Sequence, residues 1–458
     1  MRISNLNCAD DIGASAWMVE MDHHRILLDC GCHPKRDGSS SLPLLSQFKK
    51  SEVDAIAISH CHHDHVGALP VAVRHFPQAH VLMTELSYFL VERVLHNSAN
   101  VMKRQRSEGT SDAPALYDHE EIDSIAHLFQ GFRYNREIEW AAFHKTRSGL
   151  QSPTLEFLDA GHALGSAGIL LRSRDETAFF TGDVSFRDQT ILKGARFDNV
   201  QADVLIMETT RGNKEIPADL SRDKELDRLT QSIVEVSERD GCILIPVFAL
   251  GRTQEILAHL ALMMRAGRIR RQPIYIGGLG RVFTEIYDLQ AHRTHRHLSN
   301  MALTEALDLI VVEKRQLERM KLKGGRIFVL TAGMMSEHTA AHDLALRLAG
   351  SEKHGIFFVG YTDSSTPGGR LRAAAQGETV EFSPSGGLIT KNCEVRDFDL
   401  TAHANRDELM DLIPKVNPRT IVLGHGEPEC KEWFKTAIAR THPKIKVINP
   451  QPGETVEA

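Results

Sequence analysis

The chain has 458 residues, 42% of them hydrophobic, so it is long enough to bury two ordinary cores. Its formal net charge of −6 argues against tight nucleic-acid binding through basic residues alone. The seven cysteines are scattered, which disfavours a disulfide framework and suits a reducing compartment. With no membrane-length apolar run and no signal-peptide core, the sequence predicts a cytoplasmic protein with no membrane partner.

The first predicted strands both lead into polar turns. Residues 25–28 indicate a strand, which leads into a turn at Asp29. A buried strand over 53–59 precedes helical spacing over 66–76, where Pro70 is tolerated because it falls near the first turn. Imidazole nitrogen and carboxylate oxygen are zinc ligands, so the turn between this strand and this helix predicts a metal site, although a histidine-rich surface loop is the alternative. The candidate ligands are His60, His62, Asp64 and His65.

Further along the chain, candidate ligands again follow strands. Residues 90–132 read mainly as helix, interrupted by the polar stretch 106–112. The strand-like residues 155–158 precede His162, and the apolar run ending at Phe180 leads to Asp183. Each candidate is weak alone, because a lone histidine is usually structural and an aspartate after glycine is often a turn residue.

The second half adds an acid and two histidines at similar places. A strand over 204–207 ends at Glu208, His403 lies in a short polar turn, and the strand over 421–424 leads to His425. Several glycine-containing loops lie between Glu208 and His403. Small residues there would let backbone amides approach phosphate oxygens, and arginine adds a bidentate partner. Such glycines are more often simple turns. The candidate phosphate ligands are Arg252, Ser336, Thr366, Gly368 and Arg370.

Together these motifs resemble those of a known family. The order His60-x-His62-x-Asp64-His65 resembles the signature of the metallo-β-lactamase superfamily, and the motifs at Glu208, His403 and His425 resemble motifs A, B and C of its β-CASP branch. The resemblance implies an α/β fold, an αββα metallo-β-lactamase sandwich with an inserted α/β β-CASP domain. It implies that residues 1–210 and 376–458 form the sandwich and that residues 211–375 form the insertion.

The resemblance also implies a cofactor and a role for each candidate. The cofactor would be two zinc ions with a bridging water or hydroxide. Asp29 would support the ligand loop from behind, His403 would act as general acid, and Glu208 would favour its protonated form. Asp64 and Asp183 complete the expected catalytic group. The implied ligands are His60, His62 and His162 for one ion, Asp64, His65 and His425 for the other, and Asp183 between them.

The implied activity is that of a zinc-dependent ribonuclease, which hydrolyses RNA phosphodiester bonds as an endonuclease or a 5′-exonuclease in RNA processing or decay. His425 favours RNA, because DNA-processing members typically carry valine there. Two alternatives stay open: a phosphodiesterase or DNA nuclease of the same fold, and a non-catalytic scaffold subunit of an RNA-processing complex. The expected partner is RNA, most simply single-stranded, and a homodimer is left open.

Overall fold

The computed structural model describes residues 1–458 except 51, 141–151, 218, 299 and 385. The described chain divides into two compact units. The first unit comprises Met1–Asp188, Gly194–Ile216 and His403–Ala458, and the second comprises Gln189–Lys193 and Pro217–Ala402. Within the described residues, no helix combines the length and the apolar character needed to cross a membrane.

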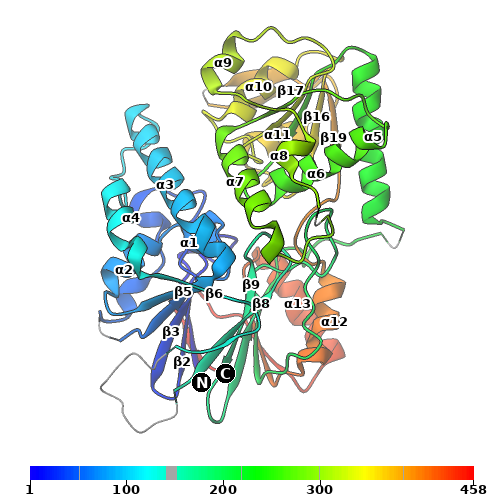
Figure 1. The fold of residues 1–458 in the computed structure, drawn as a ribbon. Helices are drawn as coiled ribbons and strands as arrows, with labels where there is room; N and C mark the ends of the chain where they lie inside the picture. The colour runs from blue at the N-terminus through cyan, green and yellow to red at the C-terminus, as the bar shows by residue number, and fades with distance from the viewer. Residues whose placement is uncertain (51, 141–151, 218, 299, 385) are drawn as a thin grey trace. The chain divides into compact units, whose positions relative to one another are not determined.

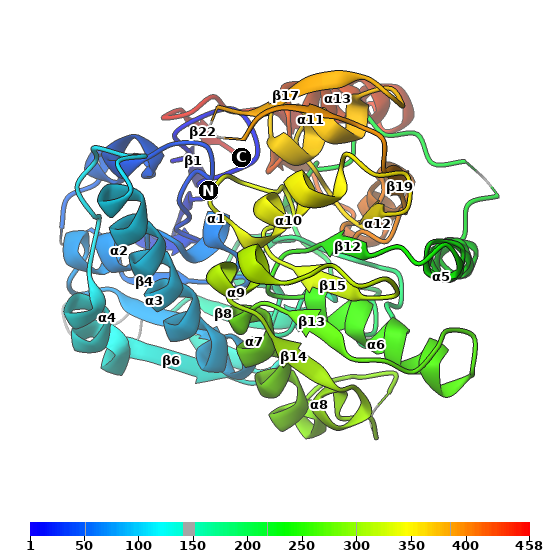
Figure 2. The same cartoon turned by 90° about the horizontal axis from the view of Figure 1, so that it is seen from above.

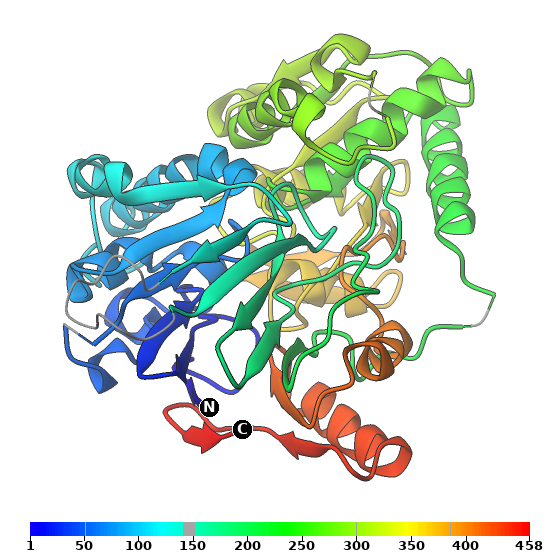
Figure 3. The same cartoon turned by 60° about the horizontal axis from the view of Figure 1, so that its bottom comes forward.

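The first unit is built on two seven-stranded sheets. The first sheet, in spatial order, contains β22 (Thr455–Glu457), β1 (Arg2–Asn5), β2 (Trp17–Met21), β3 (His24–Leu28), β4 (Ala55–Ala57), β5 (His80–Thr84) and β6 (Phe129–Phe132). The second contains β21 (Lys446–Ile448), β20 (Thr420–Gly424), β11 (Val204–Glu208), β10 (Thr177–Phe180), β9 (Ala167–Arg172), β8 (Thr154–Asp159) and β7 (Glu137–Glu139). Figure 3 shows the last strand, β22, beside the first, β1, with which it pairs antiparallel.

Helices cover the outer faces of both sheets (Figure 1). Along β11 the side chains alternate, as a strand requires. Val204 and Ile206 join the core between the two sheets, whereas Leu205 and Met207 pack with residues of α12 and α13. This four-layer arrangement confirms the predicted αββα sandwich. The helices are α1 (His63–Val66), α2 (Leu69–His75), α3 (Glu85–Ser107) and α4 (His119–Ile125) on one side, and α12 (Arg406–Val416) and α13 (Pro428–Thr441) on the other.

One predicted helix is wrong at its C-terminal end. Residues 90–132 were expected to be mainly helical, and α3 and α4 cover much of that range. The last residues form β6 instead, because they pair in parallel with β5 and bury Phe129. Sheet pairing therefore overrides local propensity here. The helix expected over 66–76 is present as α2, with Pro70 in its first turn.

The second unit is a parallel sheet of six strands between helices. Its order is β14 (Leu309–Val311), β13 (Ile274–Ile276), β15 (Ile327–Leu330), β12 (Ile243–Pro246), β16 (Gly355–Phe358) and β19 (Glu394–Asp397). Figure 2 shows α9 (Lys314–Arg319) and α10 (Ala340–Leu348) on one side of these strands and α6 (Arg252–Arg265) and α7 (Gly278–Leu289) on the other. The remaining elements are α5 (Arg222–Glu238), α8 (Leu303–Ala306), α11 (Pro367–Ala373), β17 (Thr379–Ser383) and β18 (Gly387–Thr390).

The second unit extends past residue 375. Strand β19 pairs in parallel with β16, so the unit continues to Ala402. The five residues Gln189–Lys193 also belong to it, although their chain neighbours belong to the first unit. The domain boundaries expected after residues 210 and 375 stay a prediction.

Candidate active site

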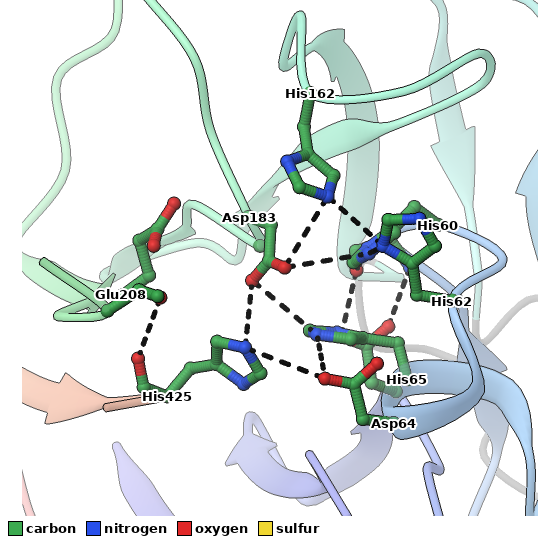
Figure 4. Close-up of polar contacts among 12 residues, drawn as sticks. His60, His62, Asp64, His65, His162, Asp183, Glu208 and His425 are labelled. Atoms are coloured by element: carbon green, nitrogen blue, oxygen red, sulfur yellow. Dashed lines mark hydrogen bonds and ion pairs between the residues drawn. The ribbon is translucent and has the colours of Figure 1, made fainter. Parts of the chain in front are cut away.

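The candidate site lies in the first unit, at one edge of its second sheet. Strands β10, β11 and β20 run parallel, so their carboxyl ends meet at the same edge. Asp183 comes shortly after β10, Glu208 is the last residue of β11, and His425 directly follows β20. All three are buried. Figure 4 shows Asp183 and His425 turned toward the histidines of the other loops.

Three histidines and one carboxylate oxygen form the first ligand set. His60 Nε2 lies 3.0 Å from His62 Nδ1, which lies 3.1 Å from His162 Nε2. Asp183 Oδ2 is 3.6 Å from both His60 Nε2 and His162 Nε2. The four atoms converge on one point, although 100 residues separate His62 from His162 (Figure 4).

The second ligand set consists of Asp64, His65 and His425. His65 Nε2 and His425 Nε2 each lie 3.8 Å from Asp64 Oδ2. The same two nitrogens lie 3.5 and 3.4 Å from Asp183 Oδ1. Since Asp183 meets the first set with Oδ2, its carboxylate connects the two sets.

The donor atoms fit metal ions. His65 Nε2 and Asp183 Oδ1 are buried and have no hydrogen-bond partner among the described residues, which is costly unless another group satisfies them. Ligands placed tetrahedrally at about 2.1 Å from zinc would be about 3.4 Å apart. The donor separations given above run from 3.0 to 3.8 Å, and all donor atoms of a group lie within 4.8 Å of one another. Three groups of side chains could each hold an ion: His60, His62, His162 and Asp183; Asp64, His65 and His425; and Asp183, Glu208 and His403, which shares Asp183 with the first.

Asp29 supports the ligand loop from behind. Its carboxylate accepts the Ser59 N–H at 2.7 Å and the Ser59 hydroxyl at 2.8 Å, and Oδ2 lies 2.7 Å from His65 Nδ1. Asp29 is fully buried, with φ at 60°, a left-handed conformation that few residues other than glycine adopt. Because Nδ1 of His65 is held by Asp29, Nε2 faces the second ligand set.

The pKa shifts of His60 and Asp183 suit metal binding, whereas at His65 burial is outweighed by Asp183, Asp29 and Asp64, which raise the pKa of its imidazole. Burial lowers the pKa of the His60 imidazole well below its usual range, so the ring is neutral. Burial by itself would raise the pKa of the Asp183 carboxyl, but His425 and His65 outweigh it and hold that pKa well below its usual range. Divalent metals require neutral imidazole and ionised carboxylate.

His403 lies beside the first ligand set. Its Nδ1 is 3.1 Å from Glu208 Oε2 and 4.0 Å from Asp183 Oδ2, and its ring centre is 4.6 Å from that of His162. Glu208 also accepts the Val184 N–H at 2.6 Å, which fixes its carboxylate. Burial opposes a charge on His403, but Glu208 and then Asp183 outweigh it and raise the pKa of the imidazole. The arrangement favours an imidazolium whose second nitrogen, Nε2, can deliver a proton.

The predicted phosphate-binding loops follow parallel strands of the second unit. The Gly368 N–H donates to the Met334 carbonyl at 3.1 Å, so the first turn of α11 is joined to the loop after β15. The Arg370 guanidinium donates to the Ser365 carbonyl at 3.1 Å. Thr366 caps the N-terminus of α11. These groups already have partners within the protein, and phosphate binding by Ser336, Thr366, Gly368 and Arg370 stays a prediction.

Arg252 is held inside the second unit. It is 7% exposed, and its guanidinium donates to the Leu400 carbonyl and to the side-chain carbonyl of Gln189. Burial lowers its pKa to about 9. The side chain therefore fastens two chain segments to the start of α6, and a phosphate-binding role for it also stays a prediction.

Two supporting serines were not predicted from the sequence. Ser166 Oγ accepts the N–H groups of His162 and Ala163 at 3.0 and 3.1 Å, which shapes that ligand loop. Ser59 connects Asp29 to the loop and its Oγ lies 3.1 Å from His60 Nδ1. The sequence did carry a signal, because Ser59 stands next to the candidate ligand His60 and Ser166 follows the candidate ligand His162 by four residues.

Comparison with known proteins matches three parts of the chain to family models. Residues 9–229 match the metallo-beta-lactamase superfamily, residues 253–371 the Beta-Casp domain, and residues 388–450 the Zn-dependent metallo-hydrolase RNA specificity domain. The chain is 31% identical to the probable RNase MJ4 of Methanocaldococcus jannaschii, over 100% of both proteins. It belongs to the β-CASP family of metallo-β-lactamase-fold hydrolases, as the sequence motifs predicted.

Other relatives point the same way. The chain is 27% identical to RNase aCSPSF2 of Saccharolobus solfataricus, over 97% of this chain and 83% of the relative. It is 25% identical to cleavage and polyadenylation specificity factor subunit 3 of Dictyostelium discoideum, of which it spans 57%. A crystal structure of a protein of unknown function from Enterococcus faecalis has a TM-score of 0.57 at 13% identity, covering 99% of each chain, and supports the fold alone.

These findings fix the general character of the site. The fold implies a divalent metal, and the two histidine and aspartate groups could bind it. The RNA specificity domain and the ribonuclease relatives support RNA binding.

Proposed function

We propose that the chain is a ribonuclease that hydrolyses RNA phosphodiester bonds at a site for two zinc ions. The observation that carries the proposal is Asp183, whose two carboxylate oxygens face two separate ligand sets at 3.4 to 3.6 Å. A carboxylate suits this post because it has two oxygens and a charge to set against two cations. His60, His62 and His162 would hold one ion, and Asp64, His65 and His425 the other.

When bound, two divalent cations would lower the pKa of a shared water and neutralise phosphate charge. The chain's own residues prepare the leaving group. His403 donates a proton from Nε2 to the departing oxygen of the RNA chain. Glu208 accepts the Nδ1–H of His403, which orients the ring and favours its charged form. Asp29 keeps the ligand loop in place through Ser59 and His65.

The direct test is digestion of RNA carrying a 5′-monophosphate or a 5′-triphosphate and labelled at either end. Hydrolysis that EDTA abolishes and zinc restores would support the proposal. Internal fragments from both substrates would identify an endonuclease, and mononucleotides released first from the 5′-monophosphate end a 5′-exonuclease.

The same assay separates the alternatives. Matched DNA and bis(4-nitrophenyl) phosphate are run beside the RNA. Cleavage of the small diester without RNA would identify a small-molecule phosphodiesterase, and equal cleavage of DNA a less selective nuclease. A protein that holds metal but cleaves none of them would fit a scaffold subunit.

Three further predictions concern the form of the RNA substrate, the location of the protein in the cell and its oligomeric state. A single-stranded RNA substrate, a cytoplasmic location and a homodimer are predictions that rest on the sequence. Subcellular fractionation tests the location, and sedimentation velocity of the purified chain tests the dimer.

A further inference from the structure

Two adjacent aromatic side chains are exposed near the start of α3. Tyr88 is 39% exposed and Phe89 is 37% exposed. Their ring centres are 5.8 Å apart and their planes meet at 80°. Leu289, Val311 and Leu388 are the other exposed large hydrophobic side chains in the described part of the chain, so these two are the aromatic ones. Exposed rings forgo the stabilisation that burial would give them.

The turn of α3 that carries this pair is bonded to loops of the first ligand set. The Ser87 carbonyl accepts the Cys61 thiol at 3.4 Å, and Cys61 stands between His60 and His62. The hydroxyls of Thr84 and Ser87 both donate to the Gly165 carbonyl, at 2.8 and 3.0 Å.

These bonds leave little room for movement. Gly165 lies three residues after His162, and a Cβ there would come within 2.6 Å of the Ser87 N–H nitrogen. Helix α3 also lies beside α1, which contains His65 (Figure 1). The position of the aromatic pair is therefore fixed relative to the candidate metal ligands.

The surroundings of the pair fit a nucleobase better than a protein partner. Leu86, Ser87 and Leu90 face the core. Exposed Arg93 follows Phe89 by one helical turn, and partly buried Glu92 follows Tyr88 in the same way, so the pair has one cation and one acid beside it. Aromatic rings beside a cation are the usual means of gripping a single strand, because every base has a face that can stack and every nucleotide carries a phosphate. Two rings among charged residues make too small an apolar patch for a stable protein interface.

We propose that Tyr88 and Phe89 form a stacking platform for bases of the RNA strand whose phosphodiester is cleaved at the candidate metal site. This inference rests on the proposed ribonuclease function and extends it. Stacking needs unpaired bases, so the platform favours single-stranded RNA and accepts different sequences. It acts on substrate binding and leaves proton transfer by His403 unchanged.

The test combines the paired substitution Tyr88→Ala and Phe89→Ala with a single-stranded oligouridylate that carries one 2-aminopurine. Stopped-flow fluorescence on mixing reports stacking as quenching before hydrolysis, and steady-state cleavage gives kcat and KM. The double alanine variant should lose the quenching and raise KM about tenfold at unchanged kcat. Its metal content and its turnover of bis(4-nitrophenyl) phosphate should match the parent.

Two further variants serve as controls. The paired substitution Tyr88→Phe and Phe89→Tyr keeps both rings and should keep the parental quenching and KM. Leu388→Ala removes an exposed apolar side chain, 74% exposed, from the second unit and should change nothing. Replacing the 2-aminopurine nucleotide by an abasic one should raise KM for the parent. The same replacement should raise KM of the double alanine variant little further.

The possible outcomes separate the two proposals. A double alanine variant with parental quenching and KM overturns the platform, and so does a ring-conserving variant that behaves like it. If the parent quenches the probe, the double alanine variant does not and neither cleaves RNA, base stacking on Tyr88 and Phe89 stands, but the ribonuclease proposal fails and the link from stacking to cleavage fails with it. A parent that neither quenches nor cleaves overturns both.

Discussion

His403 and Glu208 determine which proton the candidate site can move. Their 3.1 Å contact places a carboxylate against Nδ1 of the imidazole. Glu208 is buried and its other oxygen accepts the Val184 N–H. The ring is therefore oriented with Nε2 as the nitrogen for a leaving group. Neither His403 nor Glu208 belongs to the two ligand sets described above, although the two residues form a further group with Asp183.

Replacing His403 by glutamine should separate catalysis from metal binding. We expect zinc content to stay at the parental value, because the ligand sets remain, and kcat for RNA to fall by about 10²–10⁴-fold through loss of the proton donor. Metal analysis and single-turnover cleavage measure the two quantities. If His403→Gln cleaved RNA as fast as the parent, His403 would not be the general acid.

The pH profile should report the same pair. A proton donor works below its pKa, so kcat should fall as pH rises through the raised pKa of His403. After burial, which lowers that pKa, Glu208 is the main cause that raises it. Glu208→Gln should therefore move the falling limb to lower pH. A limb that stays in place would mean that another group is titrating.

At the residue scale, the sequence pointed to candidate ligands that the structure brings together, and their binding of zinc stays a prediction. Few side-chain types bind zinc, and most of the candidates follow a predicted strand closely. The supporting serines escaped prediction, because the bonds of Ser59 and Ser166 depend on loops that are folded together by distant strands.

At the scale of elements, the ends of β3 and β4 are tied together by Asp29. Its carboxylate takes two bonds from Ser59, which follows β4, and one from His65 in α1. These bonds set the direction in which the ligand loop leaves the sheet.

Asp29→Ala should therefore impair metal binding without removing a ligand. The Ser59 N–H and hydroxyl would lose their acceptor, and loss of such outer partners weakens metal affinity by about 10- to 100-fold. Zinc titration against a competing chelator measures the affinity. Asp29→Asn, which keeps the shape, should lose less, and parental affinity in Asp29→Ala would contradict the supporting role.

Helix α6 begins with two side chains that hold other segments of the second unit. Arg252 bonds Leu400 and Gln189, and Glu255 accepts the N–H groups of Thr190 and Ile191 at 2.5 and 3.1 Å. This explains why Gln189–Lys193 belongs to the second unit.

Arg252→Met should destabilise the second unit. It would leave buried acceptors without donors, at a cost of about 1–3 kcal/mol each, so the Tm should fall while KM for bis(4-nitrophenyl) phosphate stays parental. Arg281→Met, on a half-exposed side chain paired with Glu285 in the same helix, is the matched control and should barely change Tm. An unchanged Tm with weaker RNA binding would instead favour the predicted phosphate role.

The elements were predictable where local pattern and tertiary packing agree. Strand β11 coincides with its predicted range through Glu208 because alternate side chains are buried on both faces. The β6 segment was assigned to a helix because nothing in Phe129–Phe132 announces its pairing with β5.

At the scale of the whole molecule, length and composition anticipated two cores, and the structure has two compact units. The order in which the chain passes from one unit to the other was harder to predict from the sequence. The five residues Gln189–Lys193 belong to the second unit, although the residues on both sides of them belong to the first. Their place depends on hydrogen bonds to α6 that no local sequence pattern encodes. The net charge of −6 also gains a physical account, because bound cations at the candidate site would offset the repulsion of phosphate.

The most direct test of the central claim is the metal content of the purified chain and two single-site variants, measured by mass spectrometry after dialysis against zinc. We expect two ions per chain in the parent. We expect one ion in His162→Ala, which removes a ligand from the first set, and one in His425→Ala, which removes a ligand from the second. A parent with no bound ion, or variants that both keep two, would contradict a two-metal site built from these side chains.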